Sequence, residues 1–96
     1  MDPGRTVAEW ESDIGRQVRV LRRRVGLTQR ELARNANVSV GTVRNLESGT
    51  GSSLSTLAAV ARALGRTEWL ERLAPPVAVS PLELLEQRER GEGHKP

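Results

Sequence analysis

Arginine is the residue type in this sequence with the greatest capacity for chemistry. Fourteen of the fifteen basic residues are arginines, and ten of them lie within residues 14–66 against only two glutamates, a net charge of +8. Residues 1–13, with one arginine against four acidic residues, carry −3, and residues 67–96, with four basic residues against six glutamates, carry −2. Because planar guanidinium groups suit phosphates and guanine edges, a basic block between acidic flanks indicates a surface that meets nucleic acid.

Composition argues against other chemistries. The sequence has no cysteine, and its one histidine, His94, lies near the C-terminal end. Thiolate or histidine metal sites, disulfides and nucleophilic triads are therefore nearly excluded, so we predict no catalytic residue, no metal site and no cofactor. The lack of cysteine also fits a reducing compartment, and we expect the protein in the cytoplasm.

The length of 96 residues allows one small domain. With 36% apolar and 28% charged residues, a globular rather than a disordered chain is expected. No apolar run approaches the ~20 residues that span a bilayer, and the first residues do not resemble a signal peptide, so no membrane interaction is expected.

The sequence predicts that the elements which position the arginines are helices. Thr6 and Glu9 have the spacing of a capping box, which predicts a first helix from Thr6 to Gly26. Gly15 weakens its middle, so a start at Ser12 or Asp13 remains open. Apolar residues at three- and four-residue spacing form its expected inner face: Val7, Trp10, Ile14, Val18, Leu21 and Val25.

A second capping box, Thr28 with Glu31, opens a short second helix, and Asn37 stands where a sharp turn needs a left-handed residue. Caps and glycine stops then predict three more helices. The third is capped by Ser39 and ends at Gly49, the fourth is capped by Ser53 or Ser55, and the fifth by Thr67. The core is expected to be all-helical, with Trp10 and Trp69 as anchors.

The residue pattern of the chain changes after Pro75-Pro76. Residues 77–79 are a short β-prone run that could form an intermolecular strand, and the leucines within 82–85 give a following helix an apolar side. We predict that residues 77–90 pack against another protein surface. The expected division is an N-terminal extension or helix start, a helical domain and a C-terminal appendage: 1–13, 14–74 and 75–96.

The sequence of residues 29–48 predicts two short helices joined by a tight turn. The second helix is presented outward, which is the geometry of a helix that enters a major groove. The segments 26–33, 38–39 and 46–49 resemble the Cro/C1-type (XRE) helix-turn-helix family of transcriptional regulators. The resemblance implies an all-α, five-helix, lambda-repressor-like DNA-binding domain. Asn37 departs from it, since the family often has glycine at this turn.

The resemblance also implies which residues meet double-stranded DNA. Gln29 corresponds to a residue that contacts phosphate and braces the recognition helix, and Arg22 with Glu47 to a structural ion pair. The remaining DNA contacts are assigned to the helix 39–47 and the loop after it: Ser39, Val40, Gly41, Thr42, Arg44, Asn45, Ser48, Thr50 and Ser52.

Two of these residues depart from a pattern that often has hydrogen-bonding side chains. Val40 can only touch a thymine methyl, and Gly41 only allows close approach. Polar base contacts would then fall on Arg44 and Asn45, which suit guanine and adenine respectively, and a short or degenerate half-site is expected.

Two functions from different classes follow. The first is a sequence-specific DNA-binding regulator, a homodimeric repressor acting on an inverted repeat. The alternative is an antitoxin-like protein, similar to the HipB kind, which neutralises a toxin partner through residues 77–90. A bridging factor that has lost DNA binding fits less well, because the basic block is intact.

Overall fold

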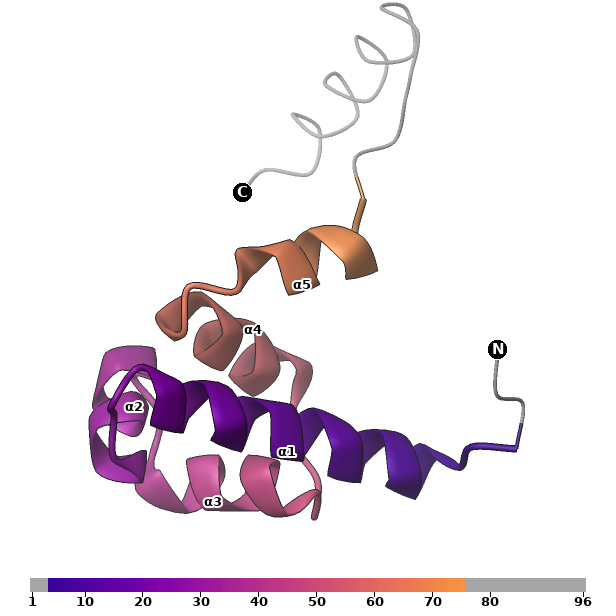
Figure 1. Ribbon diagram of the computed structural model, residues 1–96, viewed down its shortest axis with the longest axis horizontal. Coiled ribbons are helices and arrows are strands. Elements are labelled where there is room, and N and C mark those ends of the chain that lie inside the picture. The colour runs from indigo at the N-terminus through magenta and orange to yellow at the C-terminus, as the bar shows by residue number, and fades with distance from the viewer. Residues whose placement is uncertain (1–3, 76–96) are drawn as a thin grey trace, which may run out of the picture.

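The computed structural model describes residues 4–75 of the chain. These residues form five α-helices and, within this range, no strand (Figure 1). The appendage expected over 77–90, including the question of a strand at 77–79, lies outside the described residues. The helices, in chain order, are α1 (Val7–Arg24), α2 (Gln29–Ala36), α3 (Val40–Ser48), α4 (Leu54–Ala63) and α5 (Thr67–Leu73).

Helix α1 begins at Val7 because its capping box is formed. The Thr6 hydroxyl accepts a hydrogen bond from the Glu9 N–H at 3.0 Å, and the Glu9 carboxylate accepts one from the Thr6 N–H at 3.0 Å. The alternative start at Ser12 or Asp13 is therefore wrong. Gly15 lies in an unbroken helix.

The turn between α2 and α3 is made by Asn37, which adopts a left-handed conformation with φ of 57°. Asparagine tolerates this region better than most residues, so the turn does not require glycine. The N–H of Val38 donates to the Ala33 carbonyl at 2.9 Å and closes the turn. Ser39 then caps α3 by accepting from the Thr42 N–H at 3.1 Å.

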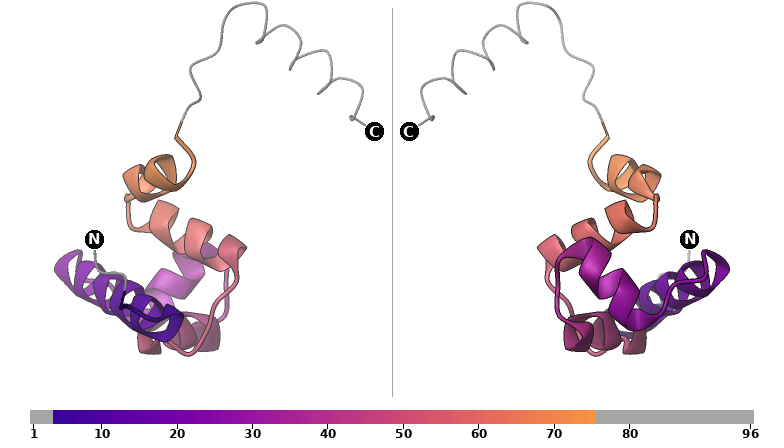
Figure 2. Two further views of the ribbon diagram at one scale, coloured as in Figure 1. Left: turned by 90° about the vertical axis from the view of Figure 1, so that its right-hand side faces the viewer. Right: turned by 90° about the vertical axis from the view of Figure 1, so that its left-hand side faces the viewer.

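The core lies where α1, α2, α3 and α4 meet. Its most deeply buried side chains, one from each helix, are Val18, Leu32, Val43 and Val60. Helix α5 lies on α4, on the side away from α3 (Figures 1 and 2). It contains no buried residue and is held mainly by α4.

Further predictions made from the sequence are wrong. The inner face expected for α1 fails at its two ends, because Val7 is 75% and Val25 is 55% exposed. Trp10 is not a core anchor, because it is 48% exposed and has the Arg5 guanidinium over its ring. The first turns of α1 extend past the end of α3, so no other helix covers them (Figure 1). Thr67 is not the cap of α5: Arg66 occupies that position, and no side chain makes a capping hydrogen bond.

Gly15 lies where α1 and α3 approach each other closely. A Cβ at this position would overlap the Leu46 carbonyl oxygen and lie 2.7 Å from that of Glu47. At the other end of the contact, a Cβ on Gly49 would lie 2.8 Å from the Cα of Ser12. The two helices therefore meet backbone to backbone, which is possible only because these positions carry no side chain.

We expect Gly15→Ala to lower the free energy of unfolding by about 1–3 kcal/mol, because the methyl group forces α1 away from α3. Gly41→Ala is the matched control, since Gly41 is also helical and a Cβ there meets only the Ser39 hydroxyl, at 3.9 Å. It should stabilise the protein by about 0.5–1 kcal/mol through helix propensity. Urea unfolding measures both, and equal effects would contradict the close approach.

Acid is expected to weaken both capped helix starts. The pKa values of Glu9 and Glu31 are lowered, chiefly because each carboxylate accepts a hydrogen bond from the backbone N–H of its capping threonine. A carboxyl group whose pKa is lower in the folded than in the unfolded state stabilises the fold at pH values above its unfolded-state pKa. This contribution is lost as the pH falls through the lowered pKa of the folded state.

Thermal unfolding at about pH 7 and about pH 3 tests this linkage. The double variant Glu9→Gln/Glu31→Gln should lose less stability on acidification than the unsubstituted protein. Glu71→Gln, an exposed glutamate of α5 that caps nothing, should lose as much as the unsubstituted protein. An acid response unchanged in the double variant would count against the linkage.

Candidate nucleic-acid interface

Helix α3 divides cleanly into a buried and an exposed side. Val43, Leu46 and Glu47 face the interior. The exposed face is formed by residues that recur at three- and four-residue spacing: Gly41, Arg44, Asn45 and Ser48. Of the residues predicted to meet DNA, these four share one accessible surface.

The side chains at the start of α3 make contacts within the protein itself. The Ser39 hydroxyl caps the helix and lies 2.7 Å from the hydroxyl of Thr42. Val40 is half-buried and packs against the core, so its side chain anchors the helix as well as bordering the exposed face. The structure thus gives this turn a role in fixing α3.

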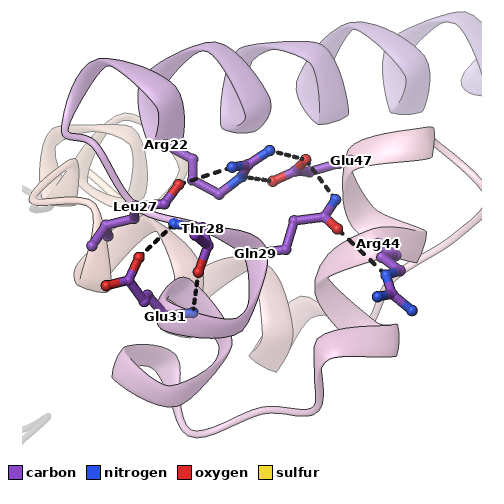
Figure 3. A network of polar contacts seen from close by, with 7 residues as sticks. All are labelled: Arg22, Leu27, Thr28, Gln29, Glu31, Arg44 and Glu47. Carbon is purple, nitrogen blue, oxygen red and sulfur yellow. Dashed lines mark hydrogen bonds and ion pairs between the residues drawn. The ribbon is translucent and has the colours of Figure 1, made fainter.

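A buried ion pair joins α1 to α3 (Figure 3). Arg22 donates from Nε to Glu47 Oε2 at 2.6 Å and from Nη2 to Oε1 at 3.1 Å, and the side chains are only 9% and 4% exposed. The Arg22 Nη1 donates to the Leu27 carbonyl at 2.9 Å. This two-pronged geometry satisfies both charged groups, as burial of an ion pair requires.

Gln29, the first residue of α2, extends this network to the exposed face of α3. Its Nε2 donates to Glu47 Oε1 at 3.1 Å, and its Oε1 accepts from Arg44 Nε at 3.4 Å (Figure 3). A continuous series of polar contacts therefore runs from α1 through Glu47 and Gln29 to Arg44. The two terminal nitrogens of Arg44 have no hydrogen bond among residues 4–75 and remain open to a ligand.

The loop after α3 contains the remaining predicted contacts. The hydroxyls of Ser48 and Thr50 lie 3.0 Å apart, and both donate to the Asn45 carbonyl, at 3.1 and 3.3 Å. The side-chain amide of Asn45 has no partner within the described part of the chain. Ser52 lies separately and donates to the Ser53 carbonyl at 3.2 Å. The structure thus brings Asn45, Ser48 and Thr50 together and leaves Ser52 apart.

No other chemistry is evident in residues 4–75. This range contains no cluster of three or more histidine, cysteine or acidic side chains that could hold a metal ion. It also contains no helix of the length and apolar character needed to cross a bilayer.

Two short helices joined by a left-handed turn, the second exposed along one face and pinned by a buried ion pair, define a helix-turn-helix DNA-binding domain. A family model described as helix-turn-helix matches residues 18–70, more than half of the chain. The chain belongs to this family, the Cro/C1 type expected from the sequence, and is a DNA-binding helix-turn-helix regulator. No curated protein matches it.

Two features of this site were missed in the sequence. Gly15 was interpreted as a weak point of the first helix, although it sets the distance between α1 and α3. Gly15, Val18 and Arg22 follow one another on one face at spacings of three and four residues, and this was the available signal. The contact between Gln29 and Arg44 had no sequence signal, because it depends on side-chain rotamers.

We expect Glu47→Leu to lower the free energy of unfolding by about 3–5 kcal/mol, because it leaves the Arg22 guanidinium buried without a counter-ion. The double variant Arg22→Met/Glu47→Leu removes both charges from the same space and should cost less than the single substitution. Urea unfolding near neutral pH compares the two. A double variant less stable than Glu47→Leu would contradict this account.

Proposed function

We propose that this protein is a homodimeric repressor that binds an inverted repeat in double-stranded DNA by inserting α3 into the major groove. The observation that carries the proposal is the exposed face of α3, whose Arg44 is already oriented through Gln29 and Glu47. A guanidinium held by its Nε keeps both terminal nitrogens directed outward, which is the geometry that pairs with the O6 and N7 atoms of guanine.

Each residue of the face has a proposed role. Arg44 reads guanine and Asn45 reads adenine, because these side chains form paired hydrogen bonds with those bases. Gly41 allows the helix to approach the groove floor, and the exposed part of Val40 touches a thymine methyl. Ser39 and Thr42 border the same groove.

The remaining residues are proposed to contact the DNA backbone. Gln29 lies at the N-terminus of α2, where the free backbone N–H groups and the helix dipole favour a phosphate. The hydroxyls of Ser48, Thr50 and Ser52 donate to the Asn45 and Ser53 carbonyls in the free protein. On binding they would rotate from these carbonyls and donate to phosphates beside the groove. Such contacts set the register of α3 without reading sequence.

Dimerisation follows from the size of the reading surface. Helix α3 has nine residues, and only one stripe of it is exposed, so a single copy reads few base pairs. Two copies related by a two-fold axis would read two half-sites about one helical turn apart. Repression follows if such a site overlaps a promoter, because the bound dimer then blocks access to it.

The antitoxin-like alternative shares the DNA-binding domain and differs by a toxin bound through residues 77–90. Those residues lie outside the described part of the chain, and no contact within residues 4–75 favours this function over a repressor. A toxin gene beside the gene for this chain would be the simplest observation in its favour.

Arg44→Ala is expected to weaken binding to the preferred site by about 1–3 kcal/mol and to relax its sequence preference. Arg62→Ala is the matched control, because it removes one arginine from the last turn of α4 and leaves α3 intact. It should leave the preference unchanged. Selection from random duplex DNA, followed by competition binding at two salt concentrations, measures both effects.

Each outcome of the selection has a definite meaning. An enriched inverted repeat supports the dimeric repressor, whereas salt-sensitive binding without enrichment would reflect backbone attraction alone and contradict it. The same preference with and without Arg44 would contradict its base-reading role.

A further inference from the structure

An apolar groove lies between α1, α4 and α5, away from the proposed DNA-reading face. It has a volume of about 260 Å³ and is lined by Ile14, Leu57, Trp69, Leu70, Arg72 and Leu73. We refer to it as the α5 groove. Only one of its lining residues is charged, and Leu73 remains 69% exposed. The described residues thus leave part of the apolar face of α5 uncovered, although Trp69 packs against the core. Exposed apolar surface is unfavourable in water.

The chain continues directly from the edge of this groove. The described part ends at Pro75, two residues after Leu73. Residues 76–96 follow, and all of their large apolar residues lie in the first ten positions: Val77, Val79, Leu82, Leu84 and Leu85. Residues 86–96 contain none. The seven residues from Pro75 to Leu82 span up to ~23 Å when extended, which suffices to reach the groove.

We propose that Leu82, Leu84 and Leu85 of the same chain dock in the α5 groove. Three leucine side chains supply apolar surface of the kind that the groove leaves exposed, and their burial favours docking. The charges agree, because Arg72 is the one charged lining residue and the leucines are interleaved with Glu83 and followed by Glu86. This inference goes beyond the proposed DNA-binding function and does not depend on it.

Docking within one chain is favoured over docking of a second copy. The short tether holds the leucines at an effective concentration on the order of millimolar, whereas a second copy must bind from dilute solution. The docked segment thereby adds a covering layer to α5, the helix with the fewest contacts to the core.

The absence of cysteine permits a direct test in the full-length protein, because every disulfide then reports an introduced pair. Ile14→Cys, in the groove, is combined in turn with Leu82→Cys, Leu84→Cys or Leu85→Cys. Val20→Cys is the matched control partner. It lies on the same helix, is also 36% exposed and does not line the groove. Cross-linking in a thiol redox buffer is followed by mass spectrometry.

We expect at least one Ile14→Cys pair to close into an intramolecular disulfide about tenfold faster than the corresponding Val20→Cys pair. Equal rates for the two partners would overturn the proposal. Disulfide-linked dimers in place of cross-linked monomers would also overturn it, since the occupant would then be a second copy.

A second measurement does not require cysteine variants to fold. In a Trp10→Phe background, the fluorescence of Trp69 reports the polarity of the groove. Deleting residues 76–96 should shift the emission to longer wavelength and lower the midpoint of thermal unfolding. Deleting only residues 87–96, which keeps every leucine as well as Glu86, should change neither. Identical emission and unfolding for the two deletions would overturn the proposal.

Discussion

The buried ion pair between Arg22 and Glu47 is the interaction on which the arrangement of this domain depends. It links α1 to the inner side of α3, and Glu47 also accepts from Gln29 of α2. Three helices therefore meet at one carboxylate. Such a pair is costly to desolvate, which offsets much of its attraction, while its two-pronged geometry constrains how the helices are oriented. The rest of the reading surface follows from that orientation.

Much of the fold could be predicted from the sequence because the signals are local. The capping box of Thr28 with Glu31, the serine cap at Ser39 and the left-handed Asn37 each depend on hydrogen bonds or backbone sterics within four residues. The structure confirms all three. Of the two alternatives for the start of α4, the structure selects Ser53. These local features place α2 and α3 and hence the motif.

What could not be predicted depends on contacts between distant parts of the chain. Periodicity placed Trp10 on the inner face of the first helix, but it does not reveal that the other helices end before reaching it. The role of Gly15 depends on how closely α3 approaches. The link from Gln29 to Arg44 depends on two rotamers across a helix pair. The DNA-contacting roles of Arg44 and Asn45 remain predictions, supported by their position on the exposed face.

The backbone contact between α1 and α3 has a consequence for how this surface can change. The carbonyl groups of Leu46 and Glu47 rest against Gly15, so the position of α3 is set from its buried side, without any side chain of the exposed face. Substitutions along that outer stripe can alter what is recognised while the helix keeps its position. Recognition and architecture are thus separable, and a lineage of such proteins can acquire new target sites one residue at a time without refolding.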